Sequence, residues 1–245
     1  MKNIKLPKII GHRGAAGLAP ENTLASINKA FETGLSYIEI DVKISKDCVP
    51  ILLHDDSLER TTNGSGFCHN YNYHELLKLD AGSWFSKNYK NERILSLSKC
   101  FDDLSKKKMN VNIELKPNKG KEIENIHCIK NLIKVKKNIP EYFFSSFDIK
   151  SLEYAKKELH SIPRSLLIEK NSTYTKNDII EMCDKFKCFC VGLEFEILDI
   201  EIVNFLKKRN LKITVFTINN INLVNNIFSL GVDSIFTDRP DLINS

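Results

Sequence analysis

The sequence has no apolar run long enough to cross a membrane. Its apolar runs fall well short of the roughly 18 residues that a transmembrane helix needs, and a composition of 42% hydrophobic and 27% charged residues is typical of a soluble globular protein. The N-terminal segment 1–14 contains lysines, but only a fragment of a signal peptide's apolar stretch precedes His12 and Arg13. We therefore expect a cytoplasmic protein without stable membrane insertion, and we interpret this segment as the first strand.

The seven cysteines also lack the paired spacing of a zinc site. They are an odd number scattered along the chain, and Cys183, Cys188 and Cys190 do not form a CxxC pair. We therefore predict reduced, buried thiols in a cytosolic compartment.

Features of nucleic-acid binding are missing as well. The sequence has no zinc finger, no aromatic motif of an RNA-recognition domain and no basic stripe with interleaved aromatic residues. The formal net charge is +5, but the lysines are dispersed and include those of a predicted helix face, Lys106–Lys108. We expect no nucleic-acid partner, and the positive charge weakly favours a small ligand that carries phosphate.

Short β-rich runs alternate with helical patterns, which indicates βα units and a parallel sheet. One helical pattern has Pro20 and Asn22 as start signals and ends at Gly34. Eight such runs predict an α/β fold, a TIM (β/α)8 barrel, with its active site at the C-terminal ends of the strands. No linker or repeat divides the chain, so we expect one domain over residues 1–245. The eight runs are 8–12, 36–42, 110–116, 142–146, 165–169, 189–194, 212–217 and 234–238.

One segment departs from this alternation. A second apolar run follows the second strand too closely for a crossover helix, so it should form an antiparallel hairpin. A turn centred between Asp47 and Cys48 would place Asp41 opposite His54. The hairpin begins a small lid-like insertion, approximately residues 43–96, whose aromatic side chains we expect at the barrel mouth.

Carboxylates recur at two-residue spacing in two consecutive barrel strands. Glu39 and Asp41 share one face of the second strand, and Glu114 and Lys116 share one face of the next. Carboxylates that point together into a barrel are tolerated when a cation lies between them, and oxygen ligands suit Mg²⁺ or Ca²⁺. The alternative is a set of interior salt bridges that join Lys116 to Glu114 or Asp41.

Two histidines should approach this cluster. His12 ends the first strand and His54 is brought there by the hairpin, and a pKa near ~6.5 suits one as base and the other as acid. Arg13 could bind two phosphate oxygens if the flanking glycines, Gly11 and Gly14, bend the backbone. A metal, two acid-base groups and two cations together predict phosphodiester displacement.

The order of short motifs resembles that of one enzyme family. HRG, PENT, EID, HDD, ERTTNG, LDAGSWFS, IELK, SSF, VFTIN and GVDSIFTDRP occur in the order seen in glycerophosphodiester phosphodiesterases. The resemblance covers nearly the whole chain and is nearest to the compact bacterial cytoplasmic form. It implies a TIM barrel with a lid-like insertion and metal-dependent hydrolysis of glycerophosphocholine, glycerophosphoethanolamine or glycerophosphoglycerol to an alcohol and sn-glycerol 3-phosphate.

The same resemblance implies roles for individual side chains. Each of these positions matches a functional position of the family: the acid-base pair His12 and His54, the metal ligands Glu39, Asp41 and Glu114, the phosphate-contacting Arg13 and Lys116, and the glycerol-packing Phe216.

The chain departs from the family at two of its motif positions. Phe216 stands where a bulkier Trp or Tyr is common, and Cys48 replaces a glycine of the hairpin turn. Asn22 is shared with the family, and we predict that it caps a helix rather than taking part in catalysis.

A lysophospholipase D-type phosphodiesterase is the alternative function. The sequence does not decide whether the cation is Mg²⁺ or Ca²⁺ or which head group is preferred. It also leaves open whether the glycerol 2-hydroxyl or water attacks first, and what the oligomeric state is.

Overall fold

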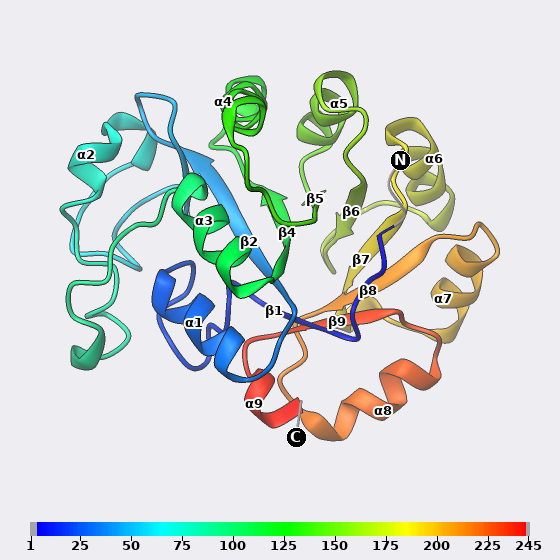
Figure 1. Cartoon of the computed structure of the whole chain (residues 1–245). Helices are drawn as coiled ribbons and strands as arrows, with labels where there is room; N and C mark the ends of the chain where they lie inside the picture. The colour runs from blue at the N-terminus through cyan, green and yellow to red at the C-terminus, as the bar shows by residue number, and fades with distance from the viewer. Residues whose placement is uncertain (1–3, 244–245) are drawn as a thin grey trace.

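The structure, a computed structural model, describes residues 4–243 and contains a closed barrel of eight parallel strands (Figure 1). The barrel closes because β1 pairs with both β9 and β2. The predicted TIM barrel is confirmed, and each predicted run overlaps one barrel strand. The strands are β1 Ile9–Gly11, β2 Tyr37–Ile44, β4 Asn110–Leu115, β5 Tyr142–Ser146, β6 Arg164–Ile168, β7 Cys190–Glu194, β8 Lys212–Phe216 and β9 Ser234–Thr237.

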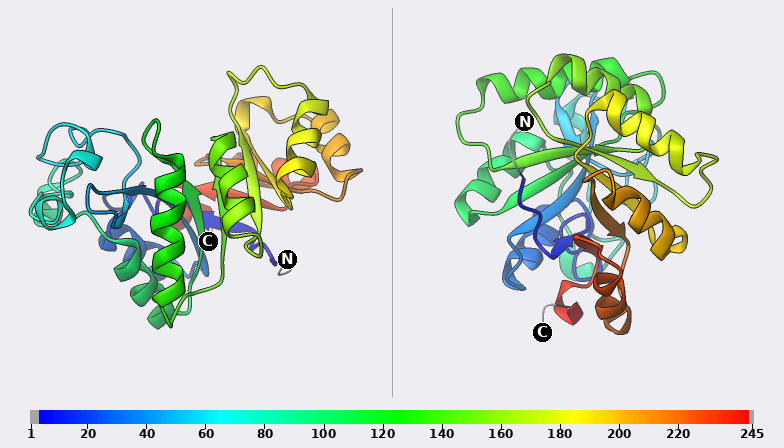
Figure 2. Two further views of the ribbon diagram at one scale, coloured as in Figure 1. Left: turned by 90° about the horizontal axis from the view of Figure 1, so that it is seen from above. Right: turned by 90° about the vertical axis from the view of Figure 1, so that its right-hand side faces the viewer.

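Helices lie around the outside of the strands, as the two views of Figure 2 show. Most begin at a Ser, Thr, Asp or Asn whose side chain accepts a hydrogen bond from the first turn, which is a common helix start. The helices that follow barrel strands or the insertion are α1 Leu24–Glu32, α3 Leu97–Lys107, α4 Glu122–Val135, α5 Ile149–Glu158, α6 Lys176–Phe186, α7 Ile200–Lys207, α8 Ile221–Ser229 and α9 Pro240–Ile243.

Helix α1 begins one residue later than a cap at Asn22 would require. Thr23 is the N-cap, because its Oγ1 accepts from Ser26 N at 3.4 Å and Ser26 Oγ accepts from Thr23 N at 3.3 Å. Asn22 has a left-handed φ of 58°, and its side-chain amide donates to Asp41 Oδ2 at 2.8 Å. The predicted helix-cap role of Asn22 is therefore wrong.

The inside of the barrel has an apolar end and a polar end. Side chains at the N-terminal end, including Ile10, Tyr37 and Phe143, form a buried apolar cluster. Glu39 lies two residues after Tyr37 on the same face of β2, and from Glu39 onward the barrel interior is polar. The alternate residues of β2, such as Ile40, pack outward in the core shared with the helices. The barrel thus places its polar groups at the carboxyl ends of the strands.

The hairpin after β2 is present, but its predicted register is wrong by one residue. Val42 pairs with Leu52 in β3 (Pro50–Leu52), so Asp41 lies opposite Leu53, whose N–H donates to Asp41 O at 3.1 Å. The turn contains three residues rather than two, because Cys48 takes a left-handed φ of 63°. Three-residue hairpin loops commonly end with a residue in the left-handed conformation, and Cys48 is the last residue of this loop.

The insertion between β3 and α3 extends beyond β2 at the left of Figure 1. It contains η1 (Cys68–Asn70), α2 (Tyr73–Leu76) and η2 (Lys87–Tyr89). Its own buried apolar cluster consists of Ile51, Leu53, Leu58, Cys68, Leu76, Ala81 and Ile94. Although it is rich in loops, this segment therefore has a packed core.

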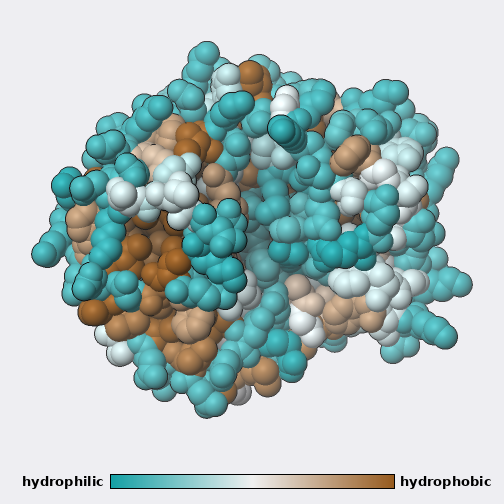
Figure 3. All heavy atoms as spheres, turned by 180° about the vertical axis from the view of Figure 1, so that it is seen from behind, coloured by the Kyte–Doolittle hydropathy of each residue, from teal (hydrophilic) through white to brown (hydrophobic). Residues whose placement is uncertain are grey.

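The surface seen from behind is mainly hydrophilic, with apolar side chains gathered toward one side (Figure 3). Figure 1 labels α7 and α8 on that side of the molecule. Each of these helices begins with an exposed isoleucine, Ile200 at 49% and Ile221 at 45%. Across residues 4–243 the longest helix, α4, has 14 residues, and no helix there is both long and apolar enough to cross a membrane.

The prediction that every thiol is reduced is wrong for two cysteines. Cys48 in the hairpin turn and Cys128 in α4 form a disulfide, with Cα atoms 5.6 Å apart. The cause is three-dimensional, since the turn of the hairpin lies against a helix 80 residues away in sequence. The remaining cysteines are free and buried: Cys68, Cys100, Cys183, Cys188 and Cys190.

We predict that reducing this disulfide lowers the free energy of unfolding by about 2–4 kcal/mol, because the bond restricts the unfolded chain. Urea unfolding with and without dithiothreitol measures the change. The matched control is the double variant Cys48→Ser, Cys128→Ser, which dithiothreitol should not affect. Maleimide labelling of the unfolded, non-reduced protein should find the five remaining thiols. Seven labelled thiols would show that the bond does not form.

Candidate active site

The turn after β1 directs Arg13 toward the barrel. Arg13 has φ 49° and Gly14 has φ 86°, so the backbone bends immediately after His12. A side chain at Gly11 would place its Cβ 2.1 Å from Gly14 O, so this turn requires glycine. Arg13 N donates to Glu39 Oε2 at 2.9 Å, which fixes the turn against β2.

Three buried carboxylates meet at the carboxyl ends of β2 and β4. Glu39, Asp41 and Glu114 are 3%, 1% and 8% exposed, and each offers an oxygen within 4.8 Å of the others. Glu39 Oε1 is buried without a hydrogen-bond partner. A buried acceptor without a donor is costly, and these oxygen ligands have the chemistry that Mg²⁺ or Ca²⁺ prefers. The three side chains therefore fit a divalent cation.

The charges around the cluster separate the pKa values of its members. Burial, together with repulsion from Asp41 and Glu114, raises the pKa of Glu39 well above its usual value. Burial also raises the pKa of Glu114. Burial acts in the same direction on Asp41, but attraction to Arg13 and Lys116 outweighs it and lowers the pKa of Asp41 to about 2. Like charges that cannot all ionise freely are neutralised by protons or by a cation.

Arg13 and Lys116 lie on either side of Asp41. Arg13 Nη1 donates to Glu21 Oε1 at 2.8 Å, and its Nε lies 3.3 Å from Asp41 Oδ2. Lys116 Nζ donates to Glu114 Oε1 at 2.8 Å and lies 3.9 Å from Asp41 Oδ1. The interior salt bridges considered from the sequence are therefore present, and they coexist with the carboxylate cluster.

Each histidine is held through Nδ1 by a carboxylate. His12 Nδ1 lies 2.7 Å from Asp238 Oδ1, and His12 Nε2 is 3.9 Å from Glu39 Oε2. His54 Nδ1 lies 2.6 Å from Asp55 Oδ1. A carboxylate on one ring nitrogen fixes the tautomer and leaves the other nitrogen for a substrate. Both Nε2 atoms are thus available for proton transfer.

Arg60 of the insertion connects the carboxylate that holds His54 with the carboxylate that holds Arg13. Its Nε and Nη2 donate to Asp55 at 2.6 and 2.9 Å, and its guanidinium also donates to both oxygens of Glu21 at 2.8 Å. Glu21 in turn accepts from Arg13. Burial lowers the pKa of His54, and the nearby charges of Arg13 and Lys116 lower it further, against the opposing attraction of Asp41.

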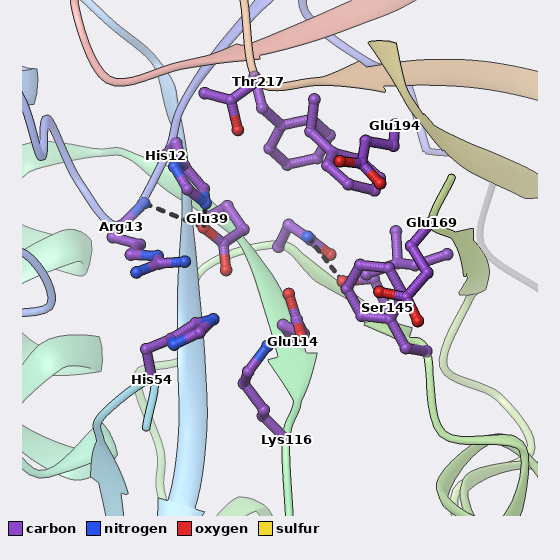
Figure 4. A pocket seen from close by; sticks show the side chains of 15 residues that line it. His12, Arg13, Glu39, His54, Glu114, Lys116, Ser145, Glu169, Glu194 and Thr217 are labelled. Carbon is purple, nitrogen blue, oxygen red and sulfur yellow. Dashed lines mark hydrogen bonds and ion pairs between the residues drawn. The ribbon is translucent and has the colours of Figure 1, made fainter. Parts of the chain in front are cut away.

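The site residues surround a cavity of about 490 Å³ (Figure 4). Phe216 lines it, with its ring edge-on to Phe147 at 5.6 Å between centroids. Asp41 is the one predicted site residue that does not line it, because Asn22 and Arg13 contact its carboxylate. The predicted residues that line the cavity are His12, Arg13, Glu39, His54, Glu114, Lys116 and Phe216.

Sequence reasoning missed several supporting residues. Asp238 follows the last barrel strand, a position that in itself points to the mouth of the barrel. Lys43 continues the inner face of β2 after Asp41. Lys43 is 1% exposed, and its Nζ donates to Asp56 Oδ1 at 2.7 Å and to Lys116 O at 3.0 Å. The strand positions of Asp238 and Lys43 could have identified them from the sequence. The contacts of Arg60 with its carboxylate partners could not be identified in this way, because they form only in the folded chain.

The fold and the site define a TIM-barrel enzyme whose pocket combines buried carboxylates, two oriented histidines and two cations. Residues 12–242 match the profile of the glycerophosphoryl diester phosphodiesterase family. The chain therefore belongs to that family, and it is an enzyme of the phosphoric diester hydrolase class.

Individual relatives agree with this assignment. A glycerophosphodiester phosphodiesterase of Caldanaerobacter subterraneus is 32% identical, with 96% of each chain aligned. The structure of a phosphodiesterase of Oleispira antarctica in complex with the product sn-glycerol-3-phosphate is 35% identical, with TM-score 0.91, covering 97% of this chain and 95% of that chain. A glycerophosphodiester phosphodiesterase of Agrobacterium tumefaciens is 26% identical, with TM-score 0.79, covering 98% and 99%.

Proposed function

We propose that the protein hydrolyses glycerophosphodiesters to an alcohol and sn-glycerol 3-phosphate with the help of a divalent cation. The substrates are glycerophosphocholine, glycerophosphoethanolamine and glycerophosphoglycerol. The observation that carries the proposal is that two histidines, each oriented by a carboxylate, line the same cavity as Glu39 and Glu114. The product bound in the structure of the Oleispira antarctica relative supports the same reaction.

Glu39, Asp41 and Glu114 would hold the cation, either Mg²⁺ or Ca²⁺. The unpaired Glu39 Oε1 supports this role, because coordination would satisfy an otherwise buried acceptor. A bound divalent cation would supply positive charge next to the phosphate oxygens.

Arg13, Lys116 and Phe216 position the substrate in this proposal. The guanidinium of Arg13 and the ammonium of Lys116 each have a donor in use by a carboxylate and further N–H groups for phosphate oxygens. Phe216 is partly exposed in the cavity, where its ring can pack on the glycerol carbons.

His12 acts as the base and His54 as the acid. His12 Nε2 accepts the proton of the attacking hydroxyl, which is the glycerol 2-hydroxyl or a water. The attacking oxygen forms a bond to phosphorus while the bond between phosphorus and the oxygen of the leaving alcohol breaks. His54 Nε2 gives its proton to that leaving oxygen. If the 2-hydroxyl attacks, a cyclic glycerol phosphate forms, and the two histidines exchange roles while water opens it. Substrates without the 2-hydroxyl then do not react.

A lysophospholipid substrate is the second candidate, on account of two aromatic side chains of the insertion. Phe67 is 51% and Trp84 is 40% exposed. Trp84 is nevertheless engaged within the insertion, since its ring packs edge-on against Phe85 and Nε1 donates to Ala81 O at 3.0 Å. These contacts favour the water-soluble diesters.

We predict that purified protein releases sn-glycerol 3-phosphate from the three proposed diesters, that EDTA stops release, and that Mg²⁺ or Ca²⁺ restores it. A coupled assay of sn-glycerol 3-phosphate measures the rate, with lysophosphatidylcholine in vesicles as a parallel substrate. Release only from the vesicles would transfer the assignment to a lysophospholipase D. Release that persists at full rate in EDTA would contradict the metal dependence.

We also predict that His12→Ala and His54→Ala each lower kcat by on the order of 10² to 10⁴-fold, as expected for groups that transfer a proton in the transition state. His160→Ala is the matched control, because His160 is exposed and does not line the cavity. Circular dichroism confirms that the variants are folded. A near-wild-type rate for His54→Ala would refute its assigned role.

A further inference from the structure

The amino-terminal end of the barrel, opposite the catalytic cavity, carries a cluster of lysines. Helices α3 and α4 end close to where β4 and β5 begin. These helix ends are in contact, since Ser105 Oγ donates to Asn138 O at 3.3 Å and Lys136 Nζ donates to Ser98 Oγ at 3.1 Å. The left view of Figure 2 shows them together at the lower edge. The lysines that they bring together, here called the basic end, are Lys106, Lys107, Lys108, Lys134, Lys136 and Lys137.

Most of the positive charge of the basic end is not compensated. Lys107 pairs with Asp103, and Lys136 pairs with Asp102. The other four lysines are exposed, and within residues 4–243 no carboxylate pairs with any of them. Six lysines and two aspartates leave four positive charges, whereas the whole chain has a formal net charge of +5. The rest of the molecule is therefore nearly neutral.

Helix termination does not account for the whole cluster. Lysines in the last turn of a helix stabilise its exposed carbonyl groups, and this effect falls off beyond that turn. Lys108 and Lys137 follow the helices α3 and α4. Together with Lys106 they line a surface hollow of about 610 Å³, in which Asp102 is the one acidic lining residue. The hollow thus presents ammonium groups to an anionic partner.

Two exposed apolar side chains accompany the lysines. Val135, between Lys134 and Lys136, is 77% exposed, the largest fraction for a large apolar side chain within residues 4–243. Phe31 in α1 is 46% exposed, and Lys107 Nζ lies 5.9 Å from the centre of its ring. Surfaces that combine lysines with exposed apolar side chains suit the boundary between lipid headgroups and acyl chains.

We propose that the basic end docks reversibly on an anionic phospholipid surface. The ammonium groups lie among the headgroup phosphates, and Phe31 and Val135 enter the boundary beneath them. A lipid surface fits better than a nucleic acid or an acidic protein, because the basic end has no arginine for paired contacts to phosphate or carboxylate. The two apolar side chains also gain nothing from a phosphate backbone. The catalytic cavity, at the other end of the barrel, stays open to the solution.

Sedimentation with vesicles tests the docking without any substrate. Purified protein is mixed with vesicles of phosphatidylcholine alone, or of phosphatidylcholine and phosphatidylglycerol in equal amounts. We expect binding to the mixed vesicles at low salt and none to phosphatidylcholine alone. About 0.5 M NaCl should release the bound protein, because salt screens the attraction between exposed charges.

Three variants assign the binding to the basic end. The cluster variant should lower the partition coefficient on the order of 10² to 10³-fold, because each lysine near an anionic surface changes binding about fivefold. Phe31→Ser with Val135→Ser should lower it on the order of tenfold. The matched control removes four exposed, unpaired lysines of the insertion and should bind like the wild type. The cluster variant is Lys106→Gln, Lys108→Gln, Lys134→Gln and Lys137→Gln, and the control is Lys46→Gln, Lys78→Gln, Lys87→Gln and Lys90→Gln.

Three results would overturn the docking surface, provided that circular dichroism shows folded proteins. The wild type does not bind the mixed vesicles at low salt, or the cluster variant and the control lose binding equally, which would indicate general attraction to a positive protein. The third result is tighter binding to an oligonucleotide than to the vesicles, unchanged by Phe31→Ser with Val135→Ser, which would assign the basic end to nucleic acid. Release of sn-glycerol 3-phosphate is measured separately, so failure of the docking and failure of the proposed function are distinguishable.

Discussion

The structure depends most on holding three carboxylates together where water is largely excluded. Glu39, Asp41 and Glu114 repel one another, and burial makes their charges costly. Arg13 and Lys116 offset part of that charge. The bend at Gly11 and Gly14 becomes understandable from this constraint, because it brings the guanidinium to Asp41.

The same constraint explains why the insertion belongs to the site. Arg60 links the carboxylate of Asp55, which orients His54, to Glu21, which holds Arg13. Lys43 anchors the start of the insertion through Asp56. A shift of the insertion would therefore move the proposed acid, His54, and the phosphate-binding Arg13 together.

Much of the fold and of the candidate site could be predicted from local patterns. Alternation along β2 and β4 identified Glu39, Asp41, Glu114 and Lys116 as inward-facing, because side chains in a strand alternate at fixed spacing. The hairpin register depended on Cys48 taking a left-handed conformation, which the residue type does not favour. The contact of Asn22 with Asp41 and the disulfide from Cys48 arise only when distant segments meet.

Calorimetric titration of the EDTA-treated protein with Ca²⁺ and with Mg²⁺ tests the central claim most directly, because it reports cation binding without any reaction. The account predicts that one ion binds per chain and that Glu39→Gln removes or strongly weakens that binding. Binding of equal affinity in the wild type and in Glu39→Gln, or no binding of either ion to the folded wild type, would contradict it.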